Sequence, residues 1–166
     1  MFRKFYPKER INSTYQIDFE DWFQKGIRGF IFDIDNTLVM HGAPANEQAK
    51  QLFDQLRAIG LQFCLISNNQ ETRVKPFAQE VGAKFICNAH KPSKKNYEKA
   101  MEMMNTKADS TIFVGDQLFT DVYGANRARI YSILVNPIDK REEIQIIMKR
   151  KLESFVLFFY RKSKNS

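Results

Sequence analysis

The stretch IRGFIFDIDNT, residues 27–37, decides the fold. Residues 27–34 are mostly apolar and rich in β-branched and aromatic side chains, which is typical of a strand buried on both faces of a sheet. Two aspartates, Asp33 and Asp35, stand where this strand gives way to a loop. The same apolar pattern recurs four times, at residues 61–67, 84–87, 111–115 and 130–135.

Helical patterns separate these strands. Between residues 45 and 59 the apolar side chains fall on one face of a helix, and Gly60 is expected to end it. Residues 71–82 are expected to be helical, with Pro76 interrupting or restarting the helix. A further helical face runs through residues 97–104, with Ser93 at its N-cap. The alternation predicts an α/β fold, a three-layer, Rossmann-like parallel sheet of about five strands covered on both sides.

Length and composition narrow the class of protein. The 166 residues suit one domain, and 43% hydrophobic with 27% charged residues is ordinary for a soluble globular protein. No run approaches the roughly 18–20 apolar residues of a spanning helix, and the basic N-terminus lacks the apolar core of a secretory signal. Cys64 and Cys87 have no zinc spacing, which indicates a reducing, cytoplasmic compartment.

The net charge of +7 is concentrated at the two ends of the chain. Residues 1–10 carry four basic groups against one acid, and residues 149–166 carry six against one, so the body between them is close to neutral. A nucleic-acid binder more often spreads its positive charge over a folded face, so no nucleic-acid partner is expected. Basic ends beside aromatic residues suit an anionic membrane surface, and equally suit solvated tails.

Polar residues follow the first two strands directly. Asp33 and Asp35 can converge on one cavity, where one could attack or bind a metal while the other handles a proton, although D-x-D also occurs in Asx turns. Ser67 and Asn68 could hydrogen-bond an anionic oxygen, or simply cap the next helix. Both alternatives stay open from the residues alone.

Two more polar clusters follow the later strands. Lys91 precedes Pro92 and a predicted helix, where it could neutralise a phosphate or be a solvated charge. Gly115 allows close approach of a ligand, and Asp116 repeats the position of Asp33, so that the two carboxylates suit Mg²⁺. Asp121 can be explained without a ligand, as an acid in the first turn of a helix, where the helix dipole favours negative charge. Because ligands bind at the carboxyl ends of parallel strands, all four clusters are expected at one end of the sheet.

Together these motifs resemble those of the haloacid dehalogenase superfamily, which match DIDNT at 33–37, Ser67, Lys91 and GDQLFTD at 115–121. The resemblance covers about residues 25–135. The stretches SNNQETRVKPFAQEVG and AHKPSKKNY are similar to the YqeG-like type IIIA subgroup, which is related to phosphatidylglycerophosphate phosphatases. An acid at the position of Asp35 is typical of the superfamily's phosphatases and not of its dehalogenases.

The resemblance implies a Mg²⁺-dependent phosphomonoester hydrolase with an aspartyl-phosphate intermediate. Asp33 is then the nucleophile, and Asp35 protonates the leaving alkoxide before it activates water. Mg²⁺ is held by the Asp33 carboxylate, the backbone carbonyl of Asp35 and Asp116.

The same resemblance implies the supporting roles. Ser67 and Asn68 bind phosphoryl oxygens, and Lys91 adds positive charge to the same group. Asp121 orients Lys91 or a metal-bound water, and Thr37 fixes the loop of the first motif.

Short connections predict that the site is open. The loop over residues 38–44 is too small for a cap domain, and an open site admits a phosphate on a large or surface-bound molecule. We expect residues 1–24 to form a basic segment with a short helix, and residues 25–138 to form the phosphatase core. Residues 139–166 are expected to form an amphipathic helix, which either belongs to the same domain or contacts a membrane or a partner.

The C-terminal segment bears on the substrate. Apolar residues keep helical spacing from Ile144 and Ile147 to Phe159, with basic residues among and after them. A membrane-surface contact therefore favours a phospholipid, namely phosphatidylglycerophosphate, and a cytoplasmic protein that is peripheral at the membrane. Packing in the core or in a dimer explains the pattern equally well, and the sequence leaves the oligomeric state open. The alternatives are a soluble sugar- or nucleotide-phosphate phosphatase, or a non-catalytic RNA-associated module on the same fold.

Overall fold

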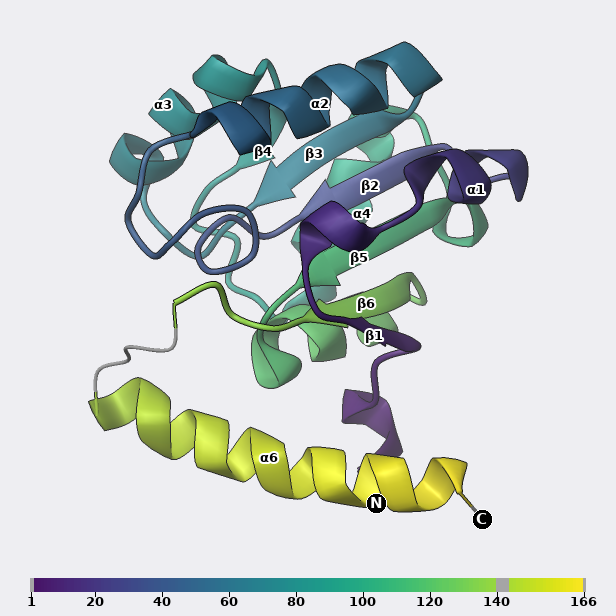
Figure 1. The fold of residues 1–166 in the computed structure, drawn as a ribbon, viewed down its shortest axis with the longest axis vertical. Coiled ribbons are helices and arrows are strands. Elements are labelled where there is room, and N and C mark those ends of the chain that lie inside the picture. The colour runs from purple at the N-terminus through teal and green to yellow at the C-terminus, as the bar shows by residue number, and fades with distance from the viewer. Residues whose placement is uncertain (1, 140–143, 166) are drawn as a thin grey trace.

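In the described parts of the chain, six parallel strands form the central sheet, in the order β1-β6-β5-β2-β3-β4 (Figure 1). The computed structural model describes residues 2–139 and 144–165. The prediction of a parallel α/β sheet is confirmed, and the sixth strand comes from the N-terminal segment, where only a short helix was expected. The strands are β1 (Glu9–Ile11), β2 (Gly29–Phe32), β3 (Gln62–Ile66), β4 (Lys84–Ile86), β5 (Thr111–Gly115) and β6 (Tyr131–Val135).

Helices cover both faces of the sheet, because alternate strand residues point to opposite sides. Phe30 and Phe32 of β2 pack with the apolar faces of α1, α2 and α3, whereas Ile31 packs with α4 and α5. The helices of these two layers are α1 (Phe19–Gln24), α2 (Glu47–Ile59), α3 (Glu71–Val81), α4 (Lys94–Met104) and α5 (Tyr123–Arg127). Shorter turns complete the chain: η1 (Arg3–Phe5), η2 (Thr14–Gln16), η3 (Ala108–Ser110) and the π-helix η4 (Leu118–Val122).

The structure confirms some of the predicted helix ends and interruptions and not others. Gly60 ends α2 in the left-handed conformation, with φ of 98°, as expected. Pro76 lies inside α3 without interrupting it, because the helix buries an apolar face on both sides of the proline. Ser93 occupies the N-cap position of α4, but its side chain makes no capping hydrogen bond.

A long C-terminal helix, α6 (Ile144–Lys164), lies outside the two helical layers (Figure 1). Its Val156 packs with Leu118 and Leu134, and Tyr160 stacks edge-on against Tyr6 of the N-terminal segment. None of the helices in the described parts of the chain is long and apolar enough to cross a bilayer. The opposite side of α6 exposes large apolar residues, namely Met148, Leu152, Phe155, Phe158 and Phe159.

From Met148 onward, one side of α6 packs against the core, and on the other side Phe155 and Phe159 contact Phe2 of the N-terminal segment while remaining exposed. The side chains of Ile144 and Ile147, which the sequence assigned to the apolar face, lie outside the described residues. Core packing therefore does not explain the exposed apolar residues of α6, such as Met148, Leu152 and Phe158.

Replacing Tyr160 by alanine should destabilise the protein by about 2–4 kcal/mol, because its side chain is only 6% exposed and its packing is lost. Phe158→Ala, at a position 62% exposed on the same helix, is the matched control and should change the free energy of unfolding by less than about 0.5 kcal/mol. Urea unfolding measures both. Equal losses would show that α6 does not dock by the Tyr160 side.

Candidate active site

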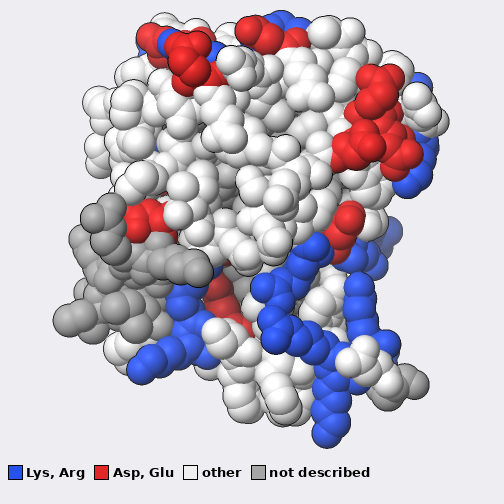
Figure 2. Space-filling view, viewed as in Figure 1, with Lys and Arg blue, Asp and Glu red and all other residues white. Residues whose placement is uncertain are grey.

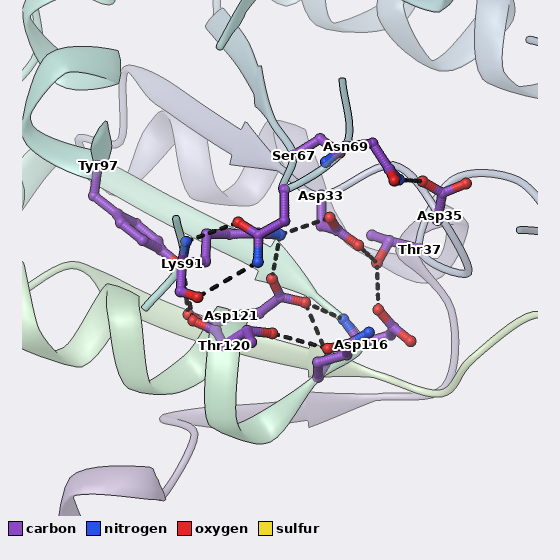
Figure 3. A network of polar contacts seen from close by, with 12 residues as sticks. Asp33, Asp35, Thr37, Ser67, Asn69, Lys91, Tyr97, Asp116, Thr120 and Asp121 are labelled. Atoms are coloured by element: carbon purple, nitrogen blue, oxygen red, sulfur yellow. Dashed lines mark hydrogen bonds and ion pairs between the residues drawn. The ribbon is translucent and has the colours of Figure 1, made fainter. Parts of the chain in front are cut away.

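The carboxyl ends of β5, β2 and β3 lie side by side and bring the predicted site residues together (Figure 3). Asp33 follows β2, Ser67 follows β3 and Asp116 follows β5, while Lys91 reaches in from the loop after β4. All four are buried. The expectation that the polar clusters meet at one end of the sheet is borne out by this geometry.

Lys91 links two of the carboxylates directly. Its Nζ donates to Asp33 Oδ1 at 2.7 Å and to Asp121 Oδ1 at 2.6 Å, with 4% of its side chain exposed. Burial disfavours the ammonium, but the neighbouring Asp121 and Asp33 carboxylates outweigh it and raise the pKa of Lys91. Lys91 is therefore a fixed positive charge in the centre of the site.

Two backbone N–H groups of its own loop hold the Asp121 carboxylate on the side away from Lys91. Its Oδ2 accepts from the backbone N–H groups of Asp116 and Gln117, at 3.1 and 3.0 Å. A Cβ at Gly115 would lie 2.5 Å from the same oxygen. Gly115 is thus needed for the approach of the Asp121 carboxylate, whereas the sequence had suggested the approach of a ligand.

Tyr97 supports the same loop and was seen in the sequence only as part of an apolar helix face. Its hydroxyl lies 3.0 Å from the carbonyl oxygen of Thr120 and 3.1 Å from that of Asp121. A Cβ at Gly124 would overlap with this hydroxyl, so the glycine makes room for it. Burial raises the pKa of Tyr97, so the phenol stays neutral.

Three buried carboxylates face one another. Asp33, Asp116 and Asp121 each offer an oxygen within 4.8 Å of the others. Burial, followed by the Asp121 charge, raises the pKa of Asp33 well above its usual range. The same two causes raise the pKa of Asp116 to about 6. This crowded negative charge and the hard oxygen donors fit a divalent cation.

Thr37 joins the first motif to the fourth. Its Oγ1 lies 3.3 Å from both Asp33 Oδ2 and Asp116 Oδ1. Thr14, in the N-terminal segment, donates its hydroxyl to the Thr37 carbonyl at 2.9 Å. The sequence predicted that Thr37 fixes this loop, but it gave no signal for Thr14, because nothing in the local pattern around residue 14 points to a partner 23 residues away.

The carboxylate of Asp35 is turned toward other partners. It accepts from Asn69 Nδ2 at 2.7 Å, from Arg73 Nη2 at 2.9 Å and from the backbone N–H of Gly42 at 2.7 Å. Figure 3 shows it apart from the network around Lys91. Sequence reasoning missed Arg73, whose only signal is its place one turn into the helix that follows Asn68 and Asn69.

The second motif shapes its own loop. Ser67 Oγ accepts from the Asn69 backbone N–H at 3.0 Å. This is the structural alternative to anion binding, in which Ser67 caps the turn into the next helix. Asn68 Oδ1 accepts from the Lys91 backbone N–H at 2.7 Å, so Asn68 positions the Lys91 loop. Phosphate binding by Ser67 and Asn68 stays a prediction.

Comparison with known proteins places this geometry in a family. A family model described as haloacid dehalogenase-like hydrolase matches residues 41–129, which is more than half of the chain. The chain belongs to the haloacid dehalogenase-like hydrolase family. The resemblance inferred from the motifs is confirmed.

Two relatives of this hydrolase carry the names of phosphatases. It is 34% identical over 159 residues to "Probable phosphatase YqeG" of Bacillus subtilis (strain 168), covering 95% of this chain and 92% of the relative. It is 25% identical over 162 residues to "Phosphatidylglycerophosphate phosphatase 1, chloroplastic/mitochondrial" of Arabidopsis thaliana, covering 91% of this chain and 47% of that protein. The chain is a phosphatase of the haloacid dehalogenase-like family.

Solved structures share the fold of this hydrolase. The cobalt-bound deoxy-D-mannose-octulosonate 8-phosphate phosphatase of Haemophilus influenzae aligns with a TM-score of 0.53 at 15% identity, over 67% of this chain and 69% of its own. A protein of Listeria monocytogenes serotype 4b aligns with a TM-score of 0.55 at 17% identity, over 71% of this chain and 86% of its own. At these identities the likeness concerns the fold alone.

In this hydrolase, α6 reaches the edge of the carboxylate cluster. Arg150 donates to the carboxylate of Asp116 and to its backbone carbonyl, and Lys149 Nζ donates to Gln117 Oε1 at 2.9 Å. The buried carboxylate of Glu153 accepts from the Leu118 backbone N–H at 3.1 Å. The sequence places Lys149 and Arg150 among the basic residues of a helix that contacts a membrane or packs on the sheet or in a dimer, and it gives no signal for these partners or for Glu153.

Lys91→Met should destabilise the metal-free protein by about 3–5 kcal/mol, because two buried carboxylates lose their shared cation. Stability of this variant should fall as the pH rises, because the raised pKa of Asp33 makes its ionisation costly in the folded state. Lys95→Met, at an exposed position of α4, is the matched control. Thermal unfolding at several pH values in EDTA measures the effect, and similar stabilities for both variants would contradict a central role for Lys91.

Proposed function

We propose that this phosphatase is a Mg²⁺-dependent phosphomonoester hydrolase that works through an aspartyl-phosphate on Asp33. The observation that supports this best is the position of Asp33, whose carboxylate lies at the end of β2 with Lys91 on one oxygen and Thr37 beside the other. A carboxylate held in this way presents one oriented oxygen for attack, next to a fixed positive charge that binds the phosphoryl group.

Asp33, Asp116 and the backbone carbonyl of Asp35 are the groups that would hold Mg²⁺. Once bound, the cation would neutralise charge on the phosphoryl group and on the crowded carboxylates. The Thr37 hydroxyl lies 3.3 Å from one oxygen of Asp33 and 3.3 Å from one oxygen of Asp116. Arg150 donates to the other carboxylate oxygen of Asp116. Arg150 therefore holds the orientation of Asp116 from outside the cluster.

The chain's own residues account for both half-reactions. An Asp33 oxygen forms a bond to phosphorus while the ester P–O bond breaks, and Asp35 gives its proton to the departing alkoxide. Water then attacks the phosphoryl group, its proton passes to Asp35, and phosphate leaves Asp33 free. Asn69 and Arg73 donate hydrogen bonds to the Asp35 carboxylate. To transfer a proton in either half-reaction, this carboxylate rotates away from them and toward the phosphoryl group.

The proposed substrate is a phospholipid with a phosphomonoester headgroup, namely phosphatidylglycerophosphate. The Arabidopsis relative supports this by its name. The exposed apolar side of α6 supports it too, since Phe155 and Phe158 are 53% and 62% exposed and Lys151 and Arg161 lie along the same helix. Such a helix suits contact with an anionic bilayer, so the proposal includes a cytoplasmic location with peripheral attachment to the membrane.

Asp33→Asn should lower phosphate release by at least about 10³-fold, because an amide is neither a competent nucleophile nor a good Mg²⁺ ligand. Asp35→Asn is the matched comparison: it should keep Mg²⁺ affinity, since its backbone carbonyl remains, and lose about 10²–10⁴-fold in rate. Single-turnover phosphate release and isothermal titration with Mg²⁺ distinguish the two. Normal turnover by a folded Asp33→Asn protein would reject the covalent mechanism.

Replacing Leu152, Phe155 and Phe158 together by serine should weaken binding to anionic vesicles by roughly tenfold or more, because each apolar side chain contributes about 1.5–3 kcal/mol when fully buried. Activity on phosphatidylglycerophosphate in vesicles should fall, while activity on a water-soluble phosphate ester should persist. Lys95→Ser, an exposed change on α4, serves as the control. Unchanged vesicle activity in the triple variant would favour the soluble-substrate alternative.

A further inference from the structure

A large cleft lies at the end of the sheet opposite the catalytic carboxylates. It is open to solvent, has a volume of about 1020 Å³ and is bordered by the N-terminal segment, the end of α1 and the last turns of α6. Its floor includes Ile27, Ala108 and Ile130, which come just before β2, β5 and β6. Because all strands are parallel, these residues mark the amino ends of the strands, so this basic cleft is separate from the active site.

Positive charge dominates the basic cleft. Figure 2 shows lysine and arginine side chains gathered at the lower right of the molecule, near the end of α6. Among the described residues, only Lys25 of the lining cations has a carboxylate within ion-pair distance, which is Asp21 at 2.7 Å. The lining contains one acid, Asp109, and six basic residues: Arg3, Lys4, Lys8, Lys25, Arg129 and Lys164.

Like charges around the basic cleft repel one another. Two further cations outside the lining, Arg10 and Arg161, lie near Tyr160, and partial burial together with the Arg161 guanidinium lowers the pKa of Arg10. Arg129 follows α5 in the left-handed conformation, with φ of 60°, and its backbone N–H donates to the Asn126 carbonyl at 3.1 Å, so this conformation belongs to the end of the helix. A bound anion would reduce the repulsion between the six cations of the lining.

The walls of the basic cleft are aromatic. Trp22 packs on Tyr131 with ring centroids 5.1 Å apart, and Tyr6 packs on Tyr160 at 4.9 Å. The volume is in the range of sites for small organic molecules, about 300–1,000 Å³. A cationic rim over aromatic walls favours a ligand that combines an anionic group with an organic body.

We propose that the basic cleft binds an organic phosphate, with its phosphate at the cationic rim and its organic part against the aromatic walls. The proposal is independent of the reaction at Asp33. Two sources supply this chemistry: a free phosphate ester such as a nucleotide, and the headgroup region of an anionic phospholipid. They share the charged group and differ in the organic part, so that a binding experiment can distinguish them.

The only tryptophan of the chain, Trp22, lies in the basic cleft and reports on its occupancy. The full-length protein in EDTA is titrated separately with ADP, with dihexanoyl phosphatidic acid below its micellar concentration and with inorganic phosphate, while Trp22 fluorescence is recorded. Saturable change with ADP assigns the free source, and change with the short lipid alone assigns the lipid source. Both results support the proposal.

The double variant Arg129→Gln, Lys164→Gln removes charge from two sides of the basic cleft and should weaken the observed binding by roughly tenfold. Both positions are exposed, so the fold should be kept, and circular dichroism checks this. Lys95→Gln, exposed on α4, is the control and should bind as the unmodified protein does. No saturable response to either organic phosphate, equal affinity in the double variant, or equal affinity for inorganic phosphate would overturn the proposal.

Discussion

The buried ammonium of Lys91 is the interaction on which the active site depends. Without it, the Asp33 and Asp121 carboxylates would face one another in a water-poor environment, where like charges are costly. Because the Lys91 ammonium pairs with both, Asp33 is held as the oriented carboxylate of the first motif and Asp121 is held as part of the surrounding loop. A charge that could be taken for a solvated lysine in the sequence is in fact the centre of the arrangement.

Several features around the site place the Asp121 carboxylate next to the Lys91 ammonium. The π-helix η4 gives the chain an extra residue per turn after β5, and Tyr97 fastens this turn through the carbonyl groups of Thr120 and Asp121. Gly115 and Gly124 remove side chains that would occupy the same space. The fourth motif is thus a packing unit as much as a set of ligands, and π-turns of this kind are frequent at functional sites.

The sequence predicted most of the fold because apolar strands and amphipathic helices are local patterns. It also predicted that Asp33, Lys91 and Asp116 meet, because carboxyl ends of parallel strands share one edge. It missed the Asp35–Arg73 and Asp116–Arg150 ion pairs, which depend on helix rotation and on where α6 docks. It missed β1 for a related reason: three residues carry too little pattern, and only the β6 edge makes them a strand.

The two outer strands of the sheet, β1 and β4, are each three residues long. Short edges offer few free backbone groups to another chain, which limits unwanted strand addition. The β1 edge also shields the five-residue β6, whose residues from Ser132 to Val135 are buried. Losing the N-terminal segment would therefore expose a longer, apolar strand edge, and the protein would become prone to self-association through its sheet.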